Sequence, residues 1–206
     1  MNVPPPTVYV VDDDDSFRQA VSRLLRASGY QVETYPSAGD FLFRGPRYGP
    51  GCLLLDVKMP GPDGLDLQSA LGTEQHSLPV IFVSGRSDIP IAVRALKAGA
   101  VDFLTKPVRH QVLLAAIEHA IAVDAKTRSC RERLKVLRSR YESLTPRENQ
   151  VFAQVVTGKL NKQIALDLCA SERTIKAHRA QVMEKMQVQS VAELVRIADQ
   201  LLVMGQ

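Results

Sequence analysis

The feature that most constrains the fold of this chain is an alternation, over its first 123 residues, of short apolar runs with stretches of helical character. The apolar runs, rich in β-branched side chains, cover residues 7–11, 30–35, 52–56, 79–83 and 101–105. The helical stretches cover residues 16–29, 37–45, 63–72, 88–100 and 108–123. Strands that alternate with helices predict an α/β fold, a doubly wound sheet of five parallel strands.

The character of the chain changes after residue 123. Residues 124–143 are charged, lack Gly and Pro, and predict a helical linker that continues the preceding helix. Beyond this linker there is no strand pattern, and four helical segments follow at residues 146–157, 161–169, 172–186 and 191–203. The predicted organisation is an N-terminal domain over 1–123, a linker over 124–143, and a small all-α domain of four helices over 144–206.

Local signals support the helices of the second domain. Thr145 and Glu148 stand at capping-box spacing around Pro146, which is a favourable first helical residue. Ser171 and Ser190 are predicted to cap the third and fourth helices of this domain.

Charge is distributed unevenly along the chain. Residues 1–125 carry 11 Lys or Arg and 14 Asp or Glu, whereas residues 126–206 carry 15 and 8. A basic second part is typical of a domain that works beside a polyanion. The three cysteines lie far apart and are expected to be reduced thiols. No apolar run approaches the roughly 20 residues of a membrane span, and no secretory signal is evident, so we expect a cytoplasmic protein without membrane contact.

The stretch VYVVDDDDSF, at residues 8–17, ends an apolar strand on four consecutive aspartates. Two unit charges about 4 Å apart repel by roughly 4 kcal/mol at an effective dielectric near 20, so these carboxylates require cations or donors nearby. Asp14 and Asp15 are expected to stabilise the start of the following helix, where negative charge is favourable. An adjacent pair such as Asp12 and Asp13 could also serve only as a helix cap.

The other charged strand ends favour a different role for that pair. Asp56 ends the third predicted strand, Ser84 follows the fourth and Lys106 the fifth. In a doubly wound sheet these ends line one crevice. Three carboxylates suit Mg²⁺, a lysine can hold a phosphoryl oxygen, and a carboxylate can attack phosphorus to form an aspartyl-phosphate.

The segments VVDD, LLLDVKMPGPDG, VSG and AGAVDFLTKP resemble, in order and spacing, the receiver domain of two-component response regulators over residues 7–122. The resemblance implies that Asp56 is the phosphoacceptor and Lys106 its phosphoryl contact. It implies Ser84 as the switch hydroxyl and Phe103 as the switch aromatic. The implied Mg²⁺ ligands are Asp12, Asp13, Asp56 and the backbone carbonyl of Lys58. The cis peptide that the family has before proline is expected at Lys106–Pro107.

Ser84 and Phe103 depart from the threonine and tyrosine that are frequent in this family, and they leave the size of the switching motion open. The segment DIPIAVRALKAGAVDFLTKP resembles the FixJ-like subgroup. Two alternatives remain. A hydrolase of the haloacid dehalogenase type also uses an aspartyl nucleophile, but its DxD spacing is missing here. A receiver fold that acts without phosphorylation would lack the acyl-phosphate.

Residues 144–203 resemble the LuxR-type helix-turn-helix of NarL/FixJ regulators, through the segments LTPRE, NKQIA, TIKAH and EKM. Apolar residues at core spacing support two packed helices, and they are Ile164, Ala165, Leu168, Ile175 and Val182. The second helix is expected to expose Arg173, Lys176, Arg179 and Gln181. Lys176 and Arg179 are candidate donors to guanine. Contacts to the DNA backbone are assigned to Lys162, Thr174 and His178. The alternative is that the second helix only exposes a basic surface to solvent and does not bind DNA.

The resemblance as a whole implies a response regulator of transcription. A partner histidine kinase is expected to phosphorylate Asp56, and the surface formed by residues 88–122 then favours a homodimer that binds paired half-sites in double-stranded promoter DNA. RNA polymerase is a further partner that such a regulator can have. The chain lacks a GxxxxGK phosphate loop, which argues against an ATP-driven activator. The kinase, the signal, the operator and the choice between activation and repression are not encoded in any recognisable motif.

Overall fold

The structure is a computed structural model that describes residues 5–44, 49–72, 78–85 and 89–202. The chain divides into two compact units, residues 1–128 and 129–206, and each is described by itself. The predicted helix ends at residues 45, 88 and 203 lie outside the described residues.

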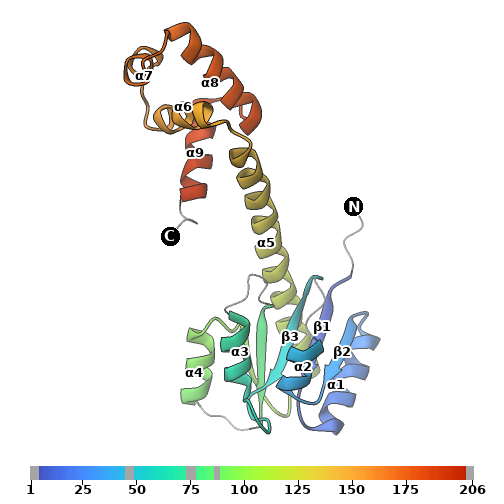
Figure 1. Ribbon diagram of the computed structural model, residues 1–206. Helices are drawn as coiled ribbons and strands as arrows, with labels where there is room; N and C mark the ends of the chain where they lie inside the picture. Colours follow the sequence, from blue (N-terminus) through green and yellow to red (C-terminus); the bar gives the residue numbers. More distant parts are fainter. Residues whose placement is uncertain (1–4, 45–48, 73–77, 86–88, 203–206) are drawn as a thin grey trace. The chain divides into compact units, whose positions relative to one another are not determined.

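The first unit contains one sheet of five parallel strands, as predicted (Figure 1). The strands are β1 (Thr7–Val11), β2 (Gln31–Tyr35), β3 (Gly51–Asp56), β4 (Val80–Ser84) and β5 (Asp102–Thr105). Their order is β2-β1-β3-β4-β5, so β1 and β3 are neighbours. Val11 pairs with Leu55, the residue before Asp56. The aspartates that follow β1 and the one that ends β3 therefore lie at the same edge of the sheet.

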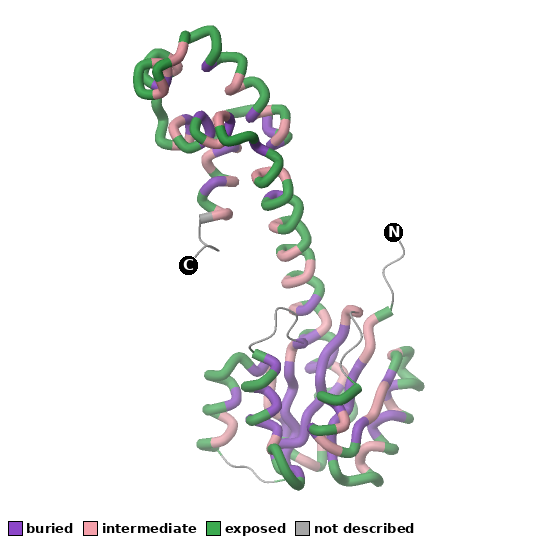
Figure 2. The backbone as a smooth tube through the Cα atoms, in the orientation of Figure 1, coloured by how far each residue is buried: buried purple, intermediate pink, exposed green. Residues whose placement is uncertain are grey.

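Helices cover both faces of the sheet. They are α1 (Asp15–Ala27), α2 (Ala38–Arg44), α3 (Gly64–Gly72), α4 (Ile89–Lys97) and α5 (His110–Glu142). One core cluster joins the sheet to α2, α3 and α4, and the other joins it to α1 and the first part of α5. All six residues of β3 are buried, because a central strand is covered on both faces (Figure 2).

The stretch expected to be a helical linker is helical. Residues 110–142 form the single helix α5, which spans both units. Within the first unit α5 is tied to the start of β3. Asp124, which is 2% exposed, accepts hydrogen bonds through Oδ2 from the Gly51 N–H at 2.9 Å and from Arg128 Nε at 2.7 Å. Arg128 also donates to the Gly49 carbonyl.

The second unit packs four short helices, as predicted, with the end of α5. They are α6 (Pro146–Val156), α7 (Asn161–Asp167), α8 (Glu172–Met186) and α9 (Val191–Leu202). Thr145 and Glu148 form the predicted capping box of α6. The Ser171 hydroxyl accepts from the Thr174 N–H at 3.1 Å, and the Ser190 hydroxyl accepts from the Glu193 N–H at 3.2 Å. The expected caps are therefore confirmed.

The core of the second unit lies between these helices. Ile164, Ile175 and Val182 are fully buried, and Ala165 and Leu168 pack against them, as the helical spacing predicted. Among the described residues, no helix combines the length and the apolar character that are needed to cross a membrane.

Candidate functional site

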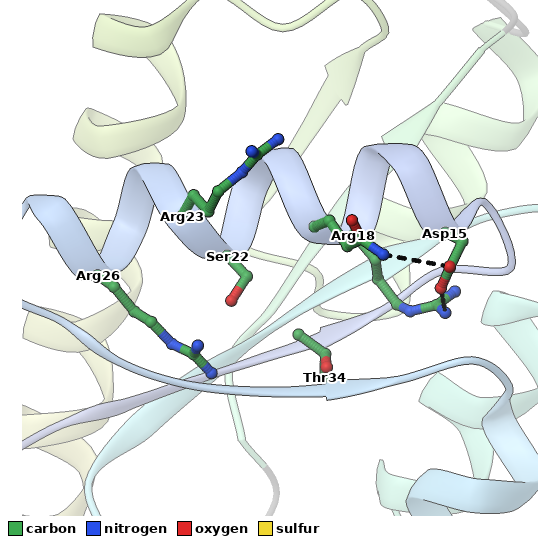
Figure 3. A pocket seen from close by; sticks show the side chains of 7 residues that line it. Asp15, Arg18, Ser22, Arg23, Arg26 and Thr34 are labelled. Atoms are coloured by element: carbon green, nitrogen blue, oxygen red, sulfur yellow. Dashed lines mark hydrogen bonds and ion pairs between the residues drawn. The ribbon is translucent and has the colours of Figure 1, made fainter.

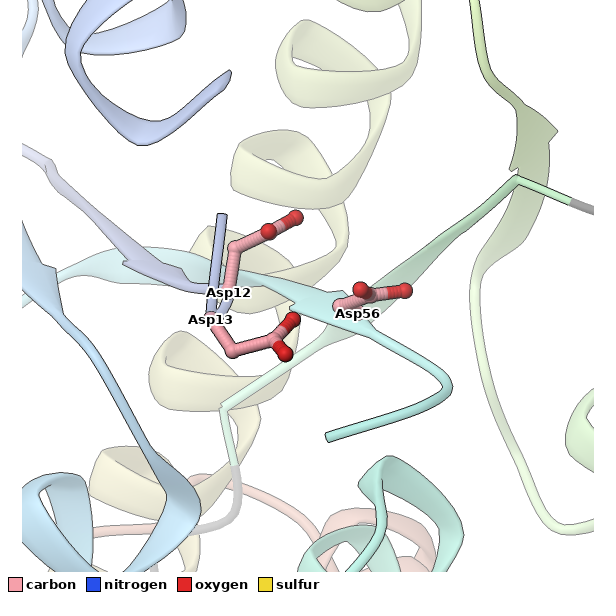
Figure 4. A group of neighbouring side chains, drawn as sticks. All are labelled: Asp12, Asp13 and Asp56. Atoms are coloured by element: carbon pink, nitrogen blue, oxygen red, sulfur yellow. The ribbon is translucent and has the colours of Figure 1, made fainter. Parts of the chain in front are cut away.

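An acidic cluster lies at the carboxyl ends of the central strands. Asp12 and Asp13 follow β1, and Asp56 ends β3 (Figure 4). One carboxylate oxygen from each of the three lies within 4.8 Å of the others. Asp12 and Asp56 are buried, at 1% and 8% exposed, while Asp13 is exposed. The sheet thus brings Asp56 next to an adjacent pair of aspartates more than 40 residues earlier in the sequence, and one of these three hard oxygen ligands faces solvent.

Two hydrogen bonds fix the position of Asp12, one from a backbone N–H and one from an arginine side chain. Its Oδ1 accepts a hydrogen bond from the Asp14 N–H at 2.9 Å, and its own carbonyl accepts one from Arg18 Nη1 at 2.6 Å. The first contact satisfies a buried carboxylate oxygen, which would otherwise be costly to desolvate. The turn after β1 is therefore held in one conformation.

Lys106 provides the positive charge of the cluster. Its Nζ lies 2.6 Å from Asp12 Oδ2 and 3.3 Å from Asp56 Oδ2, and its side chain is 19% exposed. Lys106 follows β5, and the peptide bond to Pro107 is cis, as expected. The strand order thus delivers a lysine that is 94 residues from Asp12 in sequence to within hydrogen-bond distance of it.

Burial and charge shift the pKa values of this group. Burial raises the pKa of Asp56, the neighbouring Asp12 carboxylate raises it further, and Lys106 opposes both. Burial lowers the pKa of Lys106, but the hydrogen bond and charge of Asp12 and the charge of Asp56 outweigh it, and the pKa is raised. With the three carboxylates ionised, one ammonium leaves an excess of negative charge. The site therefore favours a further cation.

A hollow of about 290 Å³ opens beside Asp56. It is lined by Asp56, Lys58, Ser84, Gly85 and Lys106. Ser84 is 4% exposed, and the Lys58 N–H lies 3.5 Å from Asp56 Oδ1. Three groups predicted from the strand ends, Asp56, Ser84 and Lys106, thus line one small polar space.

Phe103 lies on β5, three residues before Lys106. Its ring is partly buried and lies 6.3 Å from the Phe82 ring, measured between centroids. The predicted switch aromatic thus packs against the core cluster that joins the sheet to α2, α3 and α4, and it lacks the hydroxyl of a tyrosine.

The other two aspartates of the acidic run belong to α1, as predicted. Asp14 is the N-cap, and its Oδ1 accepts from the N–H groups of Ser16 at 2.9 Å and Phe17 at 3.2 Å. Asp15 lies in the first turn and forms an ion pair with Arg18. Negative charge at this end of a helix is stabilising.

Sequence reasoning missed one neighbour of the site. The ring of Phe17 lies under Lys106, with Nζ 4.1 Å from the ring centroid. The only signal available in the sequence is that Phe17 follows the aspartates within one helical turn. That position carries it to the same end of the sheet.

A second hollow, of about 400 Å³, lies between α1 and β2 (Figure 3). It is lined by Asp15, Arg18, Gln19, Ser22, Arg23, Arg26 and Thr34. Arg18 is bound to Asp15 and to the Asp12 carbonyl, and Arg26 donates to the Val32 carbonyl at 3.1 Å. Because two of the three arginines that line this hollow already have protein partners, we place the candidate site at the strand ends.

The second unit contains a helix-turn-helix formed by α7 and α8. The turn between them includes Cys169 with a positive φ of 49°, and α8 begins at its Ser171 cap. Along α8 the side chains of Arg173, Thr174, Lys176 and Gln181 are exposed, as is Lys162 on α7. These residues form a polar, largely basic surface.

Arg179 is less exposed than the sequence led us to expect. Its Nη1 donates to Asn161 Oδ1 at 2.9 Å, which joins α8 to the start of α7. His178 is also only partly exposed. Lys176 remains accessible and lies 3.8 Å from Glu172, one helical turn away. Of the two candidate guanine donors, Lys176 is therefore the freer to reach a ligand.

Comparison with known protein families gives two matches along the chain. Residues 8–118 match the response regulator receiver domain, and residues 142–198 match the luxR family of bacterial regulatory proteins. The first match contains the acidic cluster with Lys106, and the second contains the helix-turn-helix.

Relatives match both parts together. Response regulator protein TodT of Pseudomonas putida is 47% identical over 194 residues, which cover 94% of this chain and 86% of TodT. Transcriptional regulatory protein FixJ of Bradyrhizobium diazoefficiens is 40% identical, with 93% of each chain covered. Among solved structures, the response regulator StyR has a TM-score of 0.84 at 43% identity and covers 96% of this chain and all of its own.

Proposed function

Because the chain belongs to the two-component response regulators that join a receiver domain to a LuxR-type DNA-binding domain, we propose that Asp56 is the residue that receives the phosphoryl group. The observation that carries this proposal is the grouping of three carboxylates around Lys106, with a small polar hollow beside Asp56. The donor is a partner sensor histidine kinase. The phosphorylated chain regulates transcription in the cytoplasm, where promoter DNA is found.

The donor set fits Mg²⁺. Asp12, Asp13 and Asp56 offer hard oxygens from three side chains, and the exposure of Asp13 leaves room for the waters that this ion retains. The backbone carbonyl of Lys58 is proposed as a further ligand. When bound, Mg²⁺ supplies positive charge beside the oxygens of the transferring phosphoryl group.

The residues of the chain then have separate tasks in phosphoryl transfer. An oxygen of the Asp56 carboxylate forms a bond to phosphorus while the bond from phosphorus to the kinase histidine nitrogen breaks. The electron pair of the broken bond stays on the imidazole. Lys106 holds a phosphoryl oxygen by its charge, and the Ser84 hydroxyl donates a hydrogen bond to another. The chain itself catalyses only this transfer and the later hydrolysis of its own acyl-phosphate.

The switch is proposed to run through Ser84 and Phe103 to the surface formed by α4, β5 and the start of α5. Ser84 moves toward the phosphoryl group, and Phe103 packs inward behind it. Apolar side chains on this surface are exposed at Ile89, Val93, Leu96 and Val112, with Ile89 at 74%. Exposed apolar patches mark protein contacts, which supports a homodimer of phosphorylated chains.

In the second unit, Lys176 is proposed to read a base in the major groove, where lysine donates to guanine. Arg173, Lys162, Thr174 and His178 are proposed as contacts to the DNA backbone. Arg179, by its bond to Asn161, orients the two helices and lies at the edge of this surface. RNA polymerase is the further partner expected at a promoter.

The proposal is tested by DNA affinity with and without phosphorylation. Bound fragments are first selected from random double-stranded DNA, and affinity is then measured after treatment with acetyl phosphate and Mg²⁺. Treatment should raise the affinity of the wild type but not that of Asp56→Asn. Asp15→Asn is the matched control, since that carboxylate lies at the same end of the sheet but belongs to α1. Equal affinities in wild type and Asp56→Asn would refute the phosphorylation switch.

A further inference from the structure

The ammonium group of Lys106 contacts two carboxylates on one side and an aromatic ring on another. Asp12 and Asp56 accept hydrogen bonds from Nζ at 2.6 Å and 3.3 Å. The ring of Phe17 lies on another side, with its centroid 4.1 Å from Nζ. This distance is within the range of about 6 Å in which the negative face of an aromatic ring attracts a cation. An ammonium has three N–H donors, and two of them are directed at the carboxylates.

The start of α1 holds Phe17 in this place. The Asp14 carboxylate that caps the helix accepts a hydrogen bond from the Phe17 N–H at 3.2 Å. The side chain of Phe17 is partly buried and packs against the core cluster between the sheet, α1 and α5. Backbone and ring are thus both fixed by contacts that do not involve Lys106.

We propose that Phe17 is a positioning residue for phosphoryl transfer, which holds the Lys106 ammonium next to Asp56 through the face of its ring. The inference rests on the proposed function of Asp56. A lysine side chain is long and flexible, and fixing it costs side-chain entropy. A ring that stabilises the ammonium next to Asp56 offsets part of this loss of side-chain entropy before the phosphoryl group arrives.

The size of the effect follows from the environment of the ammonium. Lys106 is 19% exposed, so the strength of the contact is expected to lie between that of an exposed and that of a desolvated cation–π pair. Its loss is expected to slow phosphorylation of Asp56 by roughly 3- to 30-fold. Phe17→Leu keeps an apolar side chain of similar length but lacks a π face, whereas Phe17→Tyr retains the face.

The decisive experiment replaces Phe17 in the full chain with phenylalanines that carry one, two and three ring fluorines. Fluorine withdraws density from the ring face with little change in shape. Phosphorylation by acetyl phosphate and Mg²⁺ is followed by gel retardation of the phosphorylated chain. The rate is expected to fall progressively along the series, to be lowest with Phe17→Leu, and to be near that of wild type with Phe17→Tyr.

A second measurement needs neither metal nor phosphodonor. In the unphosphorylated chain, carbon-labelled lysine should show the ε-methylene protons of Lys106 shifted upfield by the ring of Phe17. The signal is assigned by its disappearance in Lys106→Arg, and the shift should vanish in Phe17→Leu. This contact can therefore be tested even if wild-type Asp56 took no phosphoryl group, a result that would defeat the proposed function and leave the contact between Phe17 and Lys106 standing.

Two results would overturn the positioning role. One is the absence of the upfield shift in the wild type. The other is a phosphorylation rate that stays constant along the fluorinated series, even if Phe17→Leu is slow, because such a pattern would mean that only the volume of the side chain matters.

Discussion

The buried carboxylate of Asp124 ties α5 to the start of β3, and its removal is expected to cause a large loss of stability. In Asp124→Ala the Gly51 N–H loses its acceptor inside the protein, which costs about 1–3 kcal/mol. The charge-assisted bond from Arg128 is lost as well, worth about 1.5–3 kcal/mol. Alanine favours the helix by up to about 0.7 kcal/mol. The free energy of unfolding of the first unit is therefore expected to fall by about 3 kcal/mol.

The same helix offers a matched control. Arg138 and Glu142 form an ion pair at 3.0 Å with the same spacing of four residues, but their side chains are 76% and 63% exposed. An exposed pair contributes little, so Glu142→Ala should change stability by less than about 0.5 kcal/mol. Both variants remove a carboxylate that pairs with an arginine four residues away in α5, but only the Asp124 carboxylate is buried. The comparison of the two variants therefore measures the effect of burial.

Stability is measured by hydrogen exchange of the full chain in urea, read by mass spectrometry. Peptides from β1 and β3 report the first unit, which contains Asp124, and peptides from α6 and α8 report the second, which contains Glu142, so each variant is read in its own unit. A double-mutant cycle of Asp124→Ala with Arg128→Met should give a coupling of about 1–3 kcal/mol. A loss in Asp124→Ala below about 1 kcal/mol, or one equal to that of Glu142→Ala, would refute the reasoning from burial.

Three further predictions concern other parts of the chain. The hydrogen bond from Lys185, followed by that from the Thr145 N–H, lowers the pKa of Glu148. Its carboxylate therefore contributes stability that is fully present above its ordinary pKa of 4.5 and is lost as pH falls through the lowered pKa. Urea unfolding should show Glu148→Gln less stable than wild type at pH 7, and this difference in the free energy of unfolding should disappear in acid. Gly64→Ala should destabilise the first unit by about 1–3 kcal/mol, because the new Cβ would lie 2.2 Å from the Asp56 carbonyl oxygen; a thermal midpoint equal to wild type would contradict this. In binding measurements on selected DNA, Lys176→Ala should lower affinity for the selected sequence more than Lys162→Ala does, and the reverse order would refute the assigned roles.

Much of the fold could be predicted because its signals are local. The β-branched runs and the helical stretches between them have different periodicities, and each appears within about ten residues. The caps at Asp14, Thr145 and Ser171 join atoms two or three residues apart, so their residue types suffice to predict them. The strand-end rule of doubly wound sheets then predicted that Asp56 and Lys106 share one crevice.

Contacts that depend on side-chain direction could not be predicted in this way. Arg179 was expected to be exposed, yet it donates a hydrogen bond to Asn161, 18 residues earlier, where α8 packs beside the start of α7. Asp124 reads as one charge among many in a solvated helix, yet it is 2% exposed where α5 passes the start of β3.

The sequence by itself thus determined the elements, their order and the chemical groups at the strand ends, since backbone preference and hydrophobic period act over a few neighbouring residues. Only the tertiary structure decided which atoms meet. The 2.6 Å contact between Lys106 and Asp12 and the position of the Phe17 ring under the same ammonium require the packed sheet with α1 on its face. Their geometry is set by the assembly of segments up to 94 residues apart, which no local pattern encodes.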